Sequence, residues 1–163
     1  MPSAVHKKVW IGFVITGVAV LAGALILGLW PVAGEKLPAD PDNAAQVALG
    51  KPVYAKHCAA CHGVQLEGQP DWRKPLATGR MPAPAHDASG HTWHHSDAML
   101  FGMVKHGMVP GRYAPPGHQS DMPAFGGTLT DAEIWAALAY IKTHWPTEVR
   151  KAQLEKSRTQ PPR

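Results

Sequence analysis

The sequence predicts an all-α protein: about three helices joined by long loops, preceded by a single apolar helix. Three observations support this fold class. No segment shows the alternation of polar and apolar residues that is typical of a strand. Capped helical segments recur along the 163-residue chain, and 16 glycines and 16 prolines punctuate the stretches between them. Finally, a run of 24 residues near the N-terminus carries no formal charge.

Each helix of the predicted domain has a recognisable start. Asp42 or Asn43 can cap the first helix, Ser96 caps the second, and Thr130 opens the third through a capping box. Pro52 lies inside the first helix and is expected to kink or restart it. Loops this long in a core of roughly 110 residues indicate that something other than side chains fills the centre. The predicted helices cover residues 44–57, 97–106 and 131 to about 145.

The uncharged run, residues 9–32, is long enough to cross a bilayer, because 24 residues of helix span about 36 Å. Two lysines precede it and no basic cluster follows closely, so the positive-inside tendency leaves residues 1–8 in the cytoplasm. A cleavable signal peptide has the same charge pattern. Its apolar region is typically about 7–15 residues long, however, and Leu37 stands where a small residue is preferred. We therefore expect an uncleaved anchor and a linker over residues 33–43.

The net charge of +4 is concentrated near the C-terminus. Residues 33–145 hold nine Lys/Arg and ten Asp/Glu, whereas residues 146–163 hold five and two. The predicted folded domain, residues 44–146, is therefore not basic enough to indicate nucleic-acid binding. Residues 147–163 are expected to form a charged, solvated tail.

The two cysteines of the chain belong to the pentapeptide Cys58-Ala59-Ala60-Cys61-His62. Two thiols separated by two residues and followed by an imidazole are what covalent haem attachment requires. On one helical turn the sulfurs can add to the two vinyl groups of the haem, and His62 then lies beneath the iron. A covalently held apolar cofactor would also explain a domain with long loops and no disulfide.

Three other interpretations use the same residues. A thioredoxin-like pair belongs in a βαβ pattern, which is absent from this sequence. A zinc site needs two more ligands, and His91 and His95 have a suitable spacing, but the gap from Cys61 is about double that of a compact finger. A simple disulfide between Cys58 and Cys61 is geometrically possible and has no functional consequence. We therefore favour one covalent haem c.

From about Asn43 to Trp145 the sequence resembles the class I cytochromes c. The resemblance implies that the first and last helices cross near Gly50, with Ala137 facing it where a leucine is often found. Four motifs carry the resemblance, in the expected order: Gly50-x-x-x-Tyr54, Cys58-Ala-Ala-Cys-His62-Gly63, Asp121-Met122-Pro123 and Ala139-Tyr140-Ile141.

The resemblance also implies that a methionine sulfur is the second axial ligand, supplied by the loop before the last helix. Met122 matches that position, and Met81 is the alternative because it also precedes a proline. A backbone carbonyl is needed to orient His62, and in this family a proline after the motif supplies it. The candidates are Pro75, Pro82 and Pro84.

Further residues are expected to pack around the haem or at the helix contact. Four neighbouring histidines could instead hold a second metal, copper being suited to imidazole, or ligate the haem as a bis-histidine pair. Surface or capping histidines around the haem pocket are the simpler interpretation. The packing candidates are Gly50, Tyr54, Trp93, Phe125 and Tyr140, and the histidines are His86, His91, His94 and His95.

The expected function is single-electron transfer, because His/Met ligation raises the reduction potential and a filled coordination sphere keeps oxygen and peroxide off the iron. The protein would be a carrier and not an enzyme, tethered by residues 9–32 to the periplasmic face of the cytoplasmic membrane. Its expected partners are redox proteins, such as an integral membrane oxidase or reductase. A fixed haem subunit of a larger oxidoreductase complex is one alternative, and an open-iron enzyme or ligand sensor is another.

Overall fold

The computed structural model describes residues 38–160, and this part of the chain is helical. Its only β feature is an isolated bridge between Pro110 and Ala114, so the prediction of an all-α domain is confirmed for these residues. The elements in chain order are α2 (Ala44–His57), α3 (Ala59–His62), the 3₁₀ helix η1 (Thr92–His94), α4 (Asp97–His106), α5 (Asp131–Thr143) and α6 (Thr147–Thr159).

The predicted membrane anchor, residues 9–32, and the predicted cytoplasmic segment, residues 1–8, lie outside the described residues, as does the first part of the linker. Between residues 38 and 160, no helix is both long enough and apolar enough to cross a membrane.

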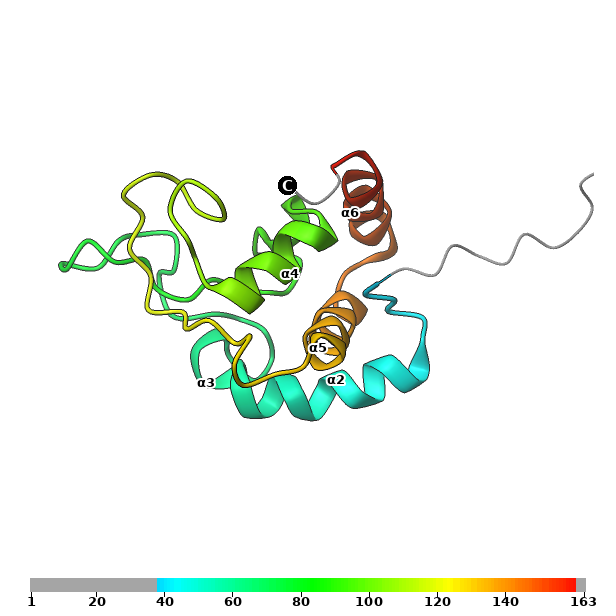
Figure 1. The fold of residues 1–163 in the computed structure, drawn as a ribbon. Coiled ribbons are helices and arrows are strands. Elements are labelled where there is room, and N and C mark those ends of the chain that lie inside the picture. The colour runs from blue at the N-terminus through cyan, green and yellow to red at the C-terminus, as the bar shows by residue number, and fades with distance from the viewer. Residues whose placement is uncertain (1–37, 161–163) are drawn as a thin grey trace, which may run out of the picture. The chain divides into compact units, whose positions relative to one another are not determined.

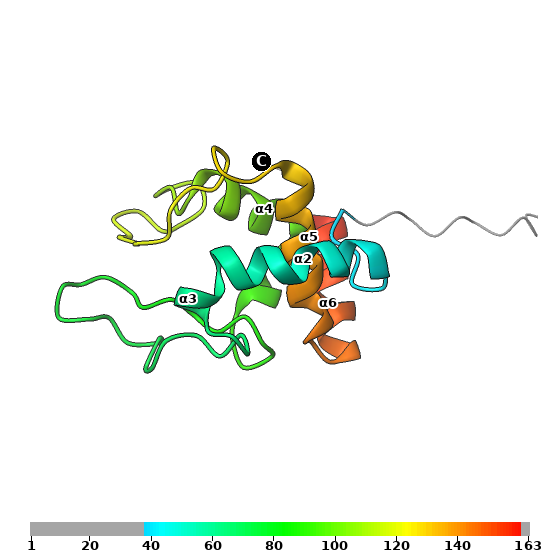
Figure 2. The same ribbon diagram turned by 90° about the horizontal axis from the view of Figure 1, so that it is seen from below.

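The core forms where α2 crosses α5, and both ribbon views show this crossing (Figure 1, Figure 2). The backbones approach closely at Gly50, where an added Cβ would overlap the carbonyl of Ala136. Next to this contact the rings of Tyr54 and Tyr140 lie 5.5 Å apart. The crossing predicted at Gly50 is therefore present, although the nearest backbone group is the Ala136 carbonyl and not the side chain of Ala137.

The predicted caps explain where the helices begin. The side chain of Asn43 accepts a hydrogen bond from the Gln46 amide at 3.1 Å, and Ser96 caps α4 in the same way. Thr130 and Glu133 form the complete capping box at the start of α5. The helix does not restart at Pro52, because α2 is a single continuous helix with the proline on its exposed side.

The expectation that residues 147–163 form a solvated tail is wrong for residues 147–159, which form α6. This helix has one buried side chain, Gln153, at 1% exposure. The packed face also includes the polar Ser157, and most of the other charged residues are exposed, so the sequence contains no apolar stripe that would have revealed this face.

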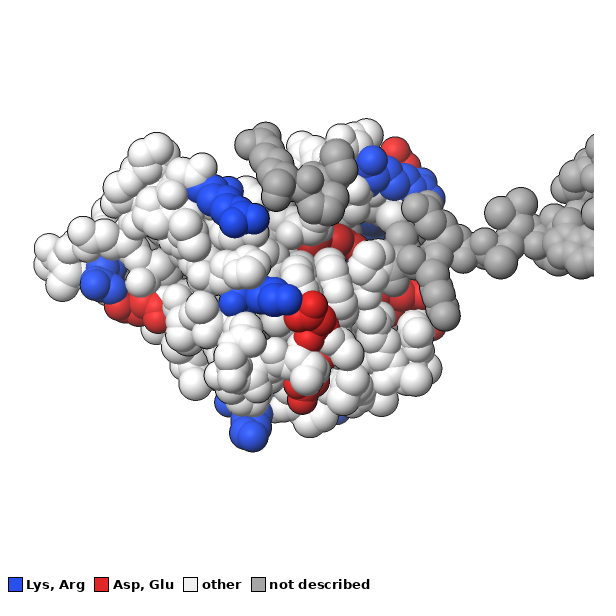
Figure 3. All heavy atoms as spheres, viewed as in Figure 1, with Lys and Arg blue, Asp and Glu red and all other residues white. Residues whose placement is uncertain are grey.

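Two long segments, residues 63–91 and 107–130, extend from the same end of the helical core in both ribbon views (Figure 1, Figure 2). On the face shown in Figure 3, acidic and basic side chains are interspersed, and no large patch of one sign is present. The site described next lies where the first of these segments folds back against α3.

Candidate functional site

The junction of α2 and α3 positions the cysteine pair. Cys58 ends α2, its amide donating to the Tyr54 carbonyl at 2.9 Å, and its own carbonyl accepts from the His62 amide at 2.9 Å. Both thiols are free, Cys61 being exposed and Cys58 half-buried. Burial, and secondarily the neighbouring Cys61, raises the pKa of Cys58 to about 11. A thiol held in its neutral form is the opposite of the activated thiolate of a dithiol oxidoreductase.

His62 is held in a fixed orientation by a backbone carbonyl. Its side chain is 7% exposed, and its Nδ1 lies 2.8 Å from the carbonyl oxygen of Pro84. Because a carbonyl can only accept, Nδ1 carries the proton and Nε2 keeps its lone pair. Burial lowers the pKa of His62 and outweighs the opposing effect of the Pro84 bond, so the ring is neutral at pH 7. Of the three proline candidates, the structure brings Pro84 to this position; Pro75 is exposed.

The loop after the motif folds back tightly because of Gly68. This glycine has a φ of +75°, its amide donates to the His62 carbonyl at 2.8 Å, and an added Cβ would overlap the backbone of Pro84 and Ala85. Tyr54 supports the same turn by donating its hydroxyl to the Gly63 carbonyl at 2.8 Å. Burial of this hydroxyl raises the pKa of Tyr54.

His86 takes a position that the sequence analysis did not foresee. Its ring stacks on that of His62, with centroids 3.9 Å apart and an angle of 23° between the planes. Its Nδ1 lies 2.7 Å from the Thr92 hydroxyl oxygen, and its carbonyl accepts from Trp145 Nε1 at 2.8 Å. Burial and the adjacent His62 keep the pKa of His86 well below its usual value. The only sequence signal for this position is that His86 lies two residues after Pro84. It could not be used, because nothing in the sequence indicates which of the three prolines orients His62.

The other cluster histidines form ring contacts of their own, and His91 also helps to lower the pKa of His86, after burial and His62. The rings of His91 and His95 are 5.7 Å apart, and Trp72 lies 5.5 Å from His91. Among residues 38–160, no group of three or more His, Cys, Asp or Glu side chains converges in a way that could hold a metal ion.

Met122 lies in the second long segment, on a more exposed loop. Its side chain is half-buried, as is that of the alternative ligand Met81. The Met122 amide donates to the Ser120 hydroxyl at 3.1 Å, and the preceding residue, Asp121, forms an ion pair with Arg80. Arg80 therefore links the segment that follows the cysteine motif to the loop that carries Met122.

The predicted packing residues have mixed surroundings. Phe125 is half-buried and its ring lies 6.2 Å from that of His57. Trp93 stacks on His94 at 3.7 Å, and its Nε1 is buried without a hydrogen-bond partner in the described part of the chain. A buried donor without a partner costs about 1–3 kcal/mol, so a group outside the described residues is expected to accept from it.

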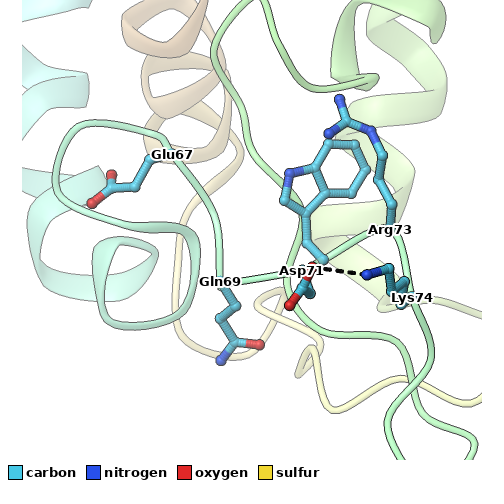
Figure 4. Close-up of a pocket in the computed structure, with 6 residues that line it drawn as sticks. Glu67, Gln69, Asp71, Arg73 and Lys74 are labelled. Atoms are coloured by element: carbon cyan, nitrogen blue, oxygen red, sulfur yellow. Dashed lines mark hydrogen bonds and ion pairs between the residues drawn. The ribbon is translucent and has the colours of Figure 1, made fainter.

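A pocket opens beside the loop that follows the cysteine motif (Figure 4). Its charges are balanced, because two acidic and two basic side chains line it and Asp71 pairs with Lys74 at 3.3 Å; the guanidinium of Arg73 lies 4.1 Å from the centre of the Trp72 ring. The pocket therefore shows no preference for a ligand of one sign. It is lined by Glu67, Gln69, Asp71, Trp72, Arg73 and Lys74.

The cytochrome c family model matches residues 47–145, more than half of the chain. This chain belongs to the cytochrome c family. Membership implies covalently bound haem c, and the spacing of Cys58 and Cys61 is that of the attachment motif, so the prediction of this cofactor is confirmed. The thioredoxin-like and zinc interpretations of the two cysteines are thereby set aside.

The residues of this cytochrome c fit the cofactor. Both thiols are free to form thioethers, the Nε2 lone pair of His62 is available, and the buried Nε1 of Trp93 has no partner within the polypeptide described. One curated relative was found, the thiosulfate dehydrogenase of Stutzerimonas stutzeri (strain A1501), which is 27% identical over 121 residues. That match covers 68% of this chain and 34% of the relative, so the cytochrome c spans about a third of the relative's length. No solved structure matched.

Proposed function

We propose that this cytochrome c is a single-electron carrier in which His62 and Met122 are the axial ligands of the haem iron. The observation that carries the proposal is the hydrogen bond between His62 Nδ1 and the Pro84 carbonyl, at 2.8 Å. This bond fixes the tautomer and directs a lone pair from Nε2, as a ligating histidine requires. The bound haem supplies the Fe(II)/Fe(III) couple, and the chain's own residues hold it, orient it and exclude water.

Met122 is the proposed second ligand for two reasons. Its loop immediately precedes α5, the position from which a methionine reaches the iron in the class I cytochromes c that the sequence resembles. Its backbone is also held on both sides, by the Arg80–Asp121 ion pair before it and by the hydrogen bond from the Phe125 amide to the Val104 carbonyl, at 2.9 Å, after it. With both axial positions filled by the protein, exogenous ligands have no open site.

The relative supports a second candidate function. A thiosulfate dehydrogenase is an enzyme, and this chain matches a third of its length. The same haem domain could therefore work as a fixed electron-transfer subunit of an oxidoreductase, with chemistry performed on another polypeptide. We favour the carrier because the chain matches only a third of the relative, and the pocket seen beside the cysteine motif in the described residues carries both acidic and basic side chains (Figure 4).

The location follows from the proposed anchor. Residues 9–32 are proposed to span the cytoplasmic membrane and to leave the haem domain on its periplasmic side. Tethering would keep the carrier close to an integral membrane oxidase or reductase and raise its effective concentration there. Solubilisation in mild detergent separates the two candidates, since a stoichiometric complex with another polypeptide supports the subunit and contradicts the free carrier.

The ligand assignment is tested by replacing Met122 with alanine in the haem-loaded protein. We expect Met122→Ala to abolish the sulfur-to-iron absorption of the oxidised protein and to allow carbon monoxide to bind the reduced protein. The matched control is Met81→Ala, which removes a similarly half-buried methionine that also precedes a proline. If the Met81 variant loses the absorption and the Met122 variant retains it, the assignment is wrong. Ready carbon monoxide binding by the wild type would instead favour the open-iron alternative.

A further inference from the structure

Helix α6 lies beyond the part of the chain that the family model matches, which ends at residue 145. The helix is nevertheless packed against the described domain, close to η1 (Figure 1). Val149 of the helix packs against the hydrophobic core, and the hydrogen bonds of Gln153 and Ser157 reach the end of one stretch of chain, residues 84–97. This stretch supplies both the carbonyl that orients His62 and the ring that stacks on it.

Two side chains of α6 hold the C-terminal end of residues 84–97. Gln153, at 1% exposure, donates to the Asp97 carboxylate at 2.6 Å and to the His95 carbonyl at 3.2 Å. The hydroxyl oxygen of Ser157 accepts from the Asp97 amide at 2.9 Å. The Asp97 carboxylate is also paired with Lys142 of α5 at 2.6 Å, so its charge is compensated inside the protein.

The N-terminal part of this stretch is held by Trp145, which lies between α5 and α6, two residues before α6 begins. Trp145, at 3% exposure, donates its Nε1 to the His86 carbonyl at 2.8 Å. From the other side the His86 amide donates to the Leu66 carbonyl at 2.7 Å. His86 is thus fixed between the loop that follows the cysteine motif and the segment that leads into α6.

These contacts lie close to the orienting bond of His62. Only one residue separates His86 from Pro84, and the backbone of Ala85 between them is packed so tightly that a Cβ on Gly90 would overlap its carbonyl. We infer that a displacement of His86 is passed through this short, tightly packed connection to the Pro84 carbonyl. The geometry of the bond between Pro84 and His62 depends on where residues 86–97 are held.

We propose that α6 is a clamp that holds residues 84–97 against His62 and thereby sets the reduction potential of the haem. In this role Gln153 is a positioning residue: it touches Asp97 and His95, and it acts on the haem through the Pro84 carbonyl. A carbonyl partner on Nδ1 makes the imidazole a stronger electron donor, which favours the oxidised iron. Loosening the clamp weakens that bond and raises the potential. This inference rests on the proposed ligation of the iron by His62.

The test uses the full-length, haem-loaded protein with Gln153→Ala. Its matched control is Lys151→Ala, an alanine substitution on the exposed face of the same helix, where Lys151 pairs only with Glu148. Ser157→Ala is a milder second variant, because it removes the hydroxyl that accepts from the Asp97 amide and from Gln153 Nε2 but keeps the bonds from Gln153 to Asp97 and His95. The measurements are amide hydrogen exchange, the reduction potential and the optical spectrum.

We expect amides in residues 84–97 of Gln153→Ala to exchange at least about tenfold faster than in the control, with the amides of α2 and α5 unchanged. We expect its potential to lie above that of the control, with Ser157→Ala in between. Unchanged exchange in residues 84–97 overturns the clamp, and so does a potential that equals or falls below that of Lys151→Ala. A wild-type spectrum that lacks the features of His/Met ligation would instead refute the proposed function. The hydrogen-exchange result tests the clamp by itself, so the two failures can be told apart.

Discussion

The two sides of the proposed haem site are built differently. The histidine side is buried and held by many bonds: His62 is 7% exposed and its orienting segment is fixed by Gly68, Trp145 and Gln153. The methionine side is a half-exposed loop, in which Met122 is held by the Ser120 hydroxyl, a surface ion pair at Asp121 and the bond from the Phe125 amide to the Val104 carbonyl. The contacts of the histidine side are therefore mostly buried, whereas those of the methionine side are more exposed.

The difference has a physical basis. A histidine donates to the iron through one nitrogen and needs its other nitrogen paired, so its surroundings must be specified to a fraction of an ångström. A thioether has no proton to place, and methionine is a flexible side chain that adapts to irregular surroundings. The buried polar contacts are therefore concentrated around His62, the ligand whose orientation matters most.

The largest expected difference between the two sides concerns their ion pairs. The Asp97–Lys142 pair behind the histidine side has side-chain exposures of 6% and 4%, whereas those of Arg80 and Asp121 are 40% and 74%. Lys142→Met leaves a buried carboxylate without its cation and should lower the free energy of unfolding by about 3–5 kcal/mol. Arg80→Met should lower it by about 1 kcal/mol or less. Urea unfolding of both variants measures this; equal losses would contradict the comparison.

A smaller difference is expected for two glycines with the same backbone conformation. Gly68 has a φ of +75° and Gly117 one of +77°, but a Cβ on Gly68 would overlap Pro84 and Ala85, whereas one on Gly117 would meet nothing within 4 Å. Gly117→Ala should therefore cost about 1–2 kcal/mol from backbone strain alone. Gly68→Ala should cost on the order of 3 kcal/mol, because overlap is added to the strain.

Thermal unfolding of the two glycine variants gives the measurement, and the reduction potential adds a second one. Gly68→Ala is expected to change the potential, since it displaces the Pro84 carbonyl from His62. Gly117→Ala is expected to leave it unchanged. If the two variants lost equal stability, the tight packing around Gly68 would not contribute to folding.

The comparison also explains which parts of the structure could be predicted from the sequence. Local signals predicted three helices and their caps, because Asn43, Ser96 and Thr130 act within one helical turn. The cysteine motif predicted the cofactor for the same reason. The stacking of His86 on His62 could not be predicted, since it depends on how a loop with few regular contacts folds back over more than twenty residues. Helix α6 was missed because its buried face is polar, with Gln153 where a hydrophobic residue would have been recognisable.

The smallest expected effect is a dependence of stability on pH, and it again concerns the histidine side. Burial, and then the neighbouring His91, His94 and Lys156, lowers the pKa of His95. Between this lowered pKa and the ordinary value of about 6.5, the unfolded chain binds more protons than the folded one, so stability is lost as the pH falls through that window. His95→Gln removes a titrating group and should flatten the decline between pH 7 and pH 5.

The matched control is His144→Gln, at an exposed position next to α5. Urea midpoints measured across this pH range for the wild type and both variants give the two slopes. The control should follow the wild type, because His144 is exposed and lies outside the buried packing around His95. If His95→Gln declined as steeply as the wild type, acid sensitivity would have to come from groups elsewhere in the chain. The burial of His95 would then make no contribution to the loss of stability at low pH.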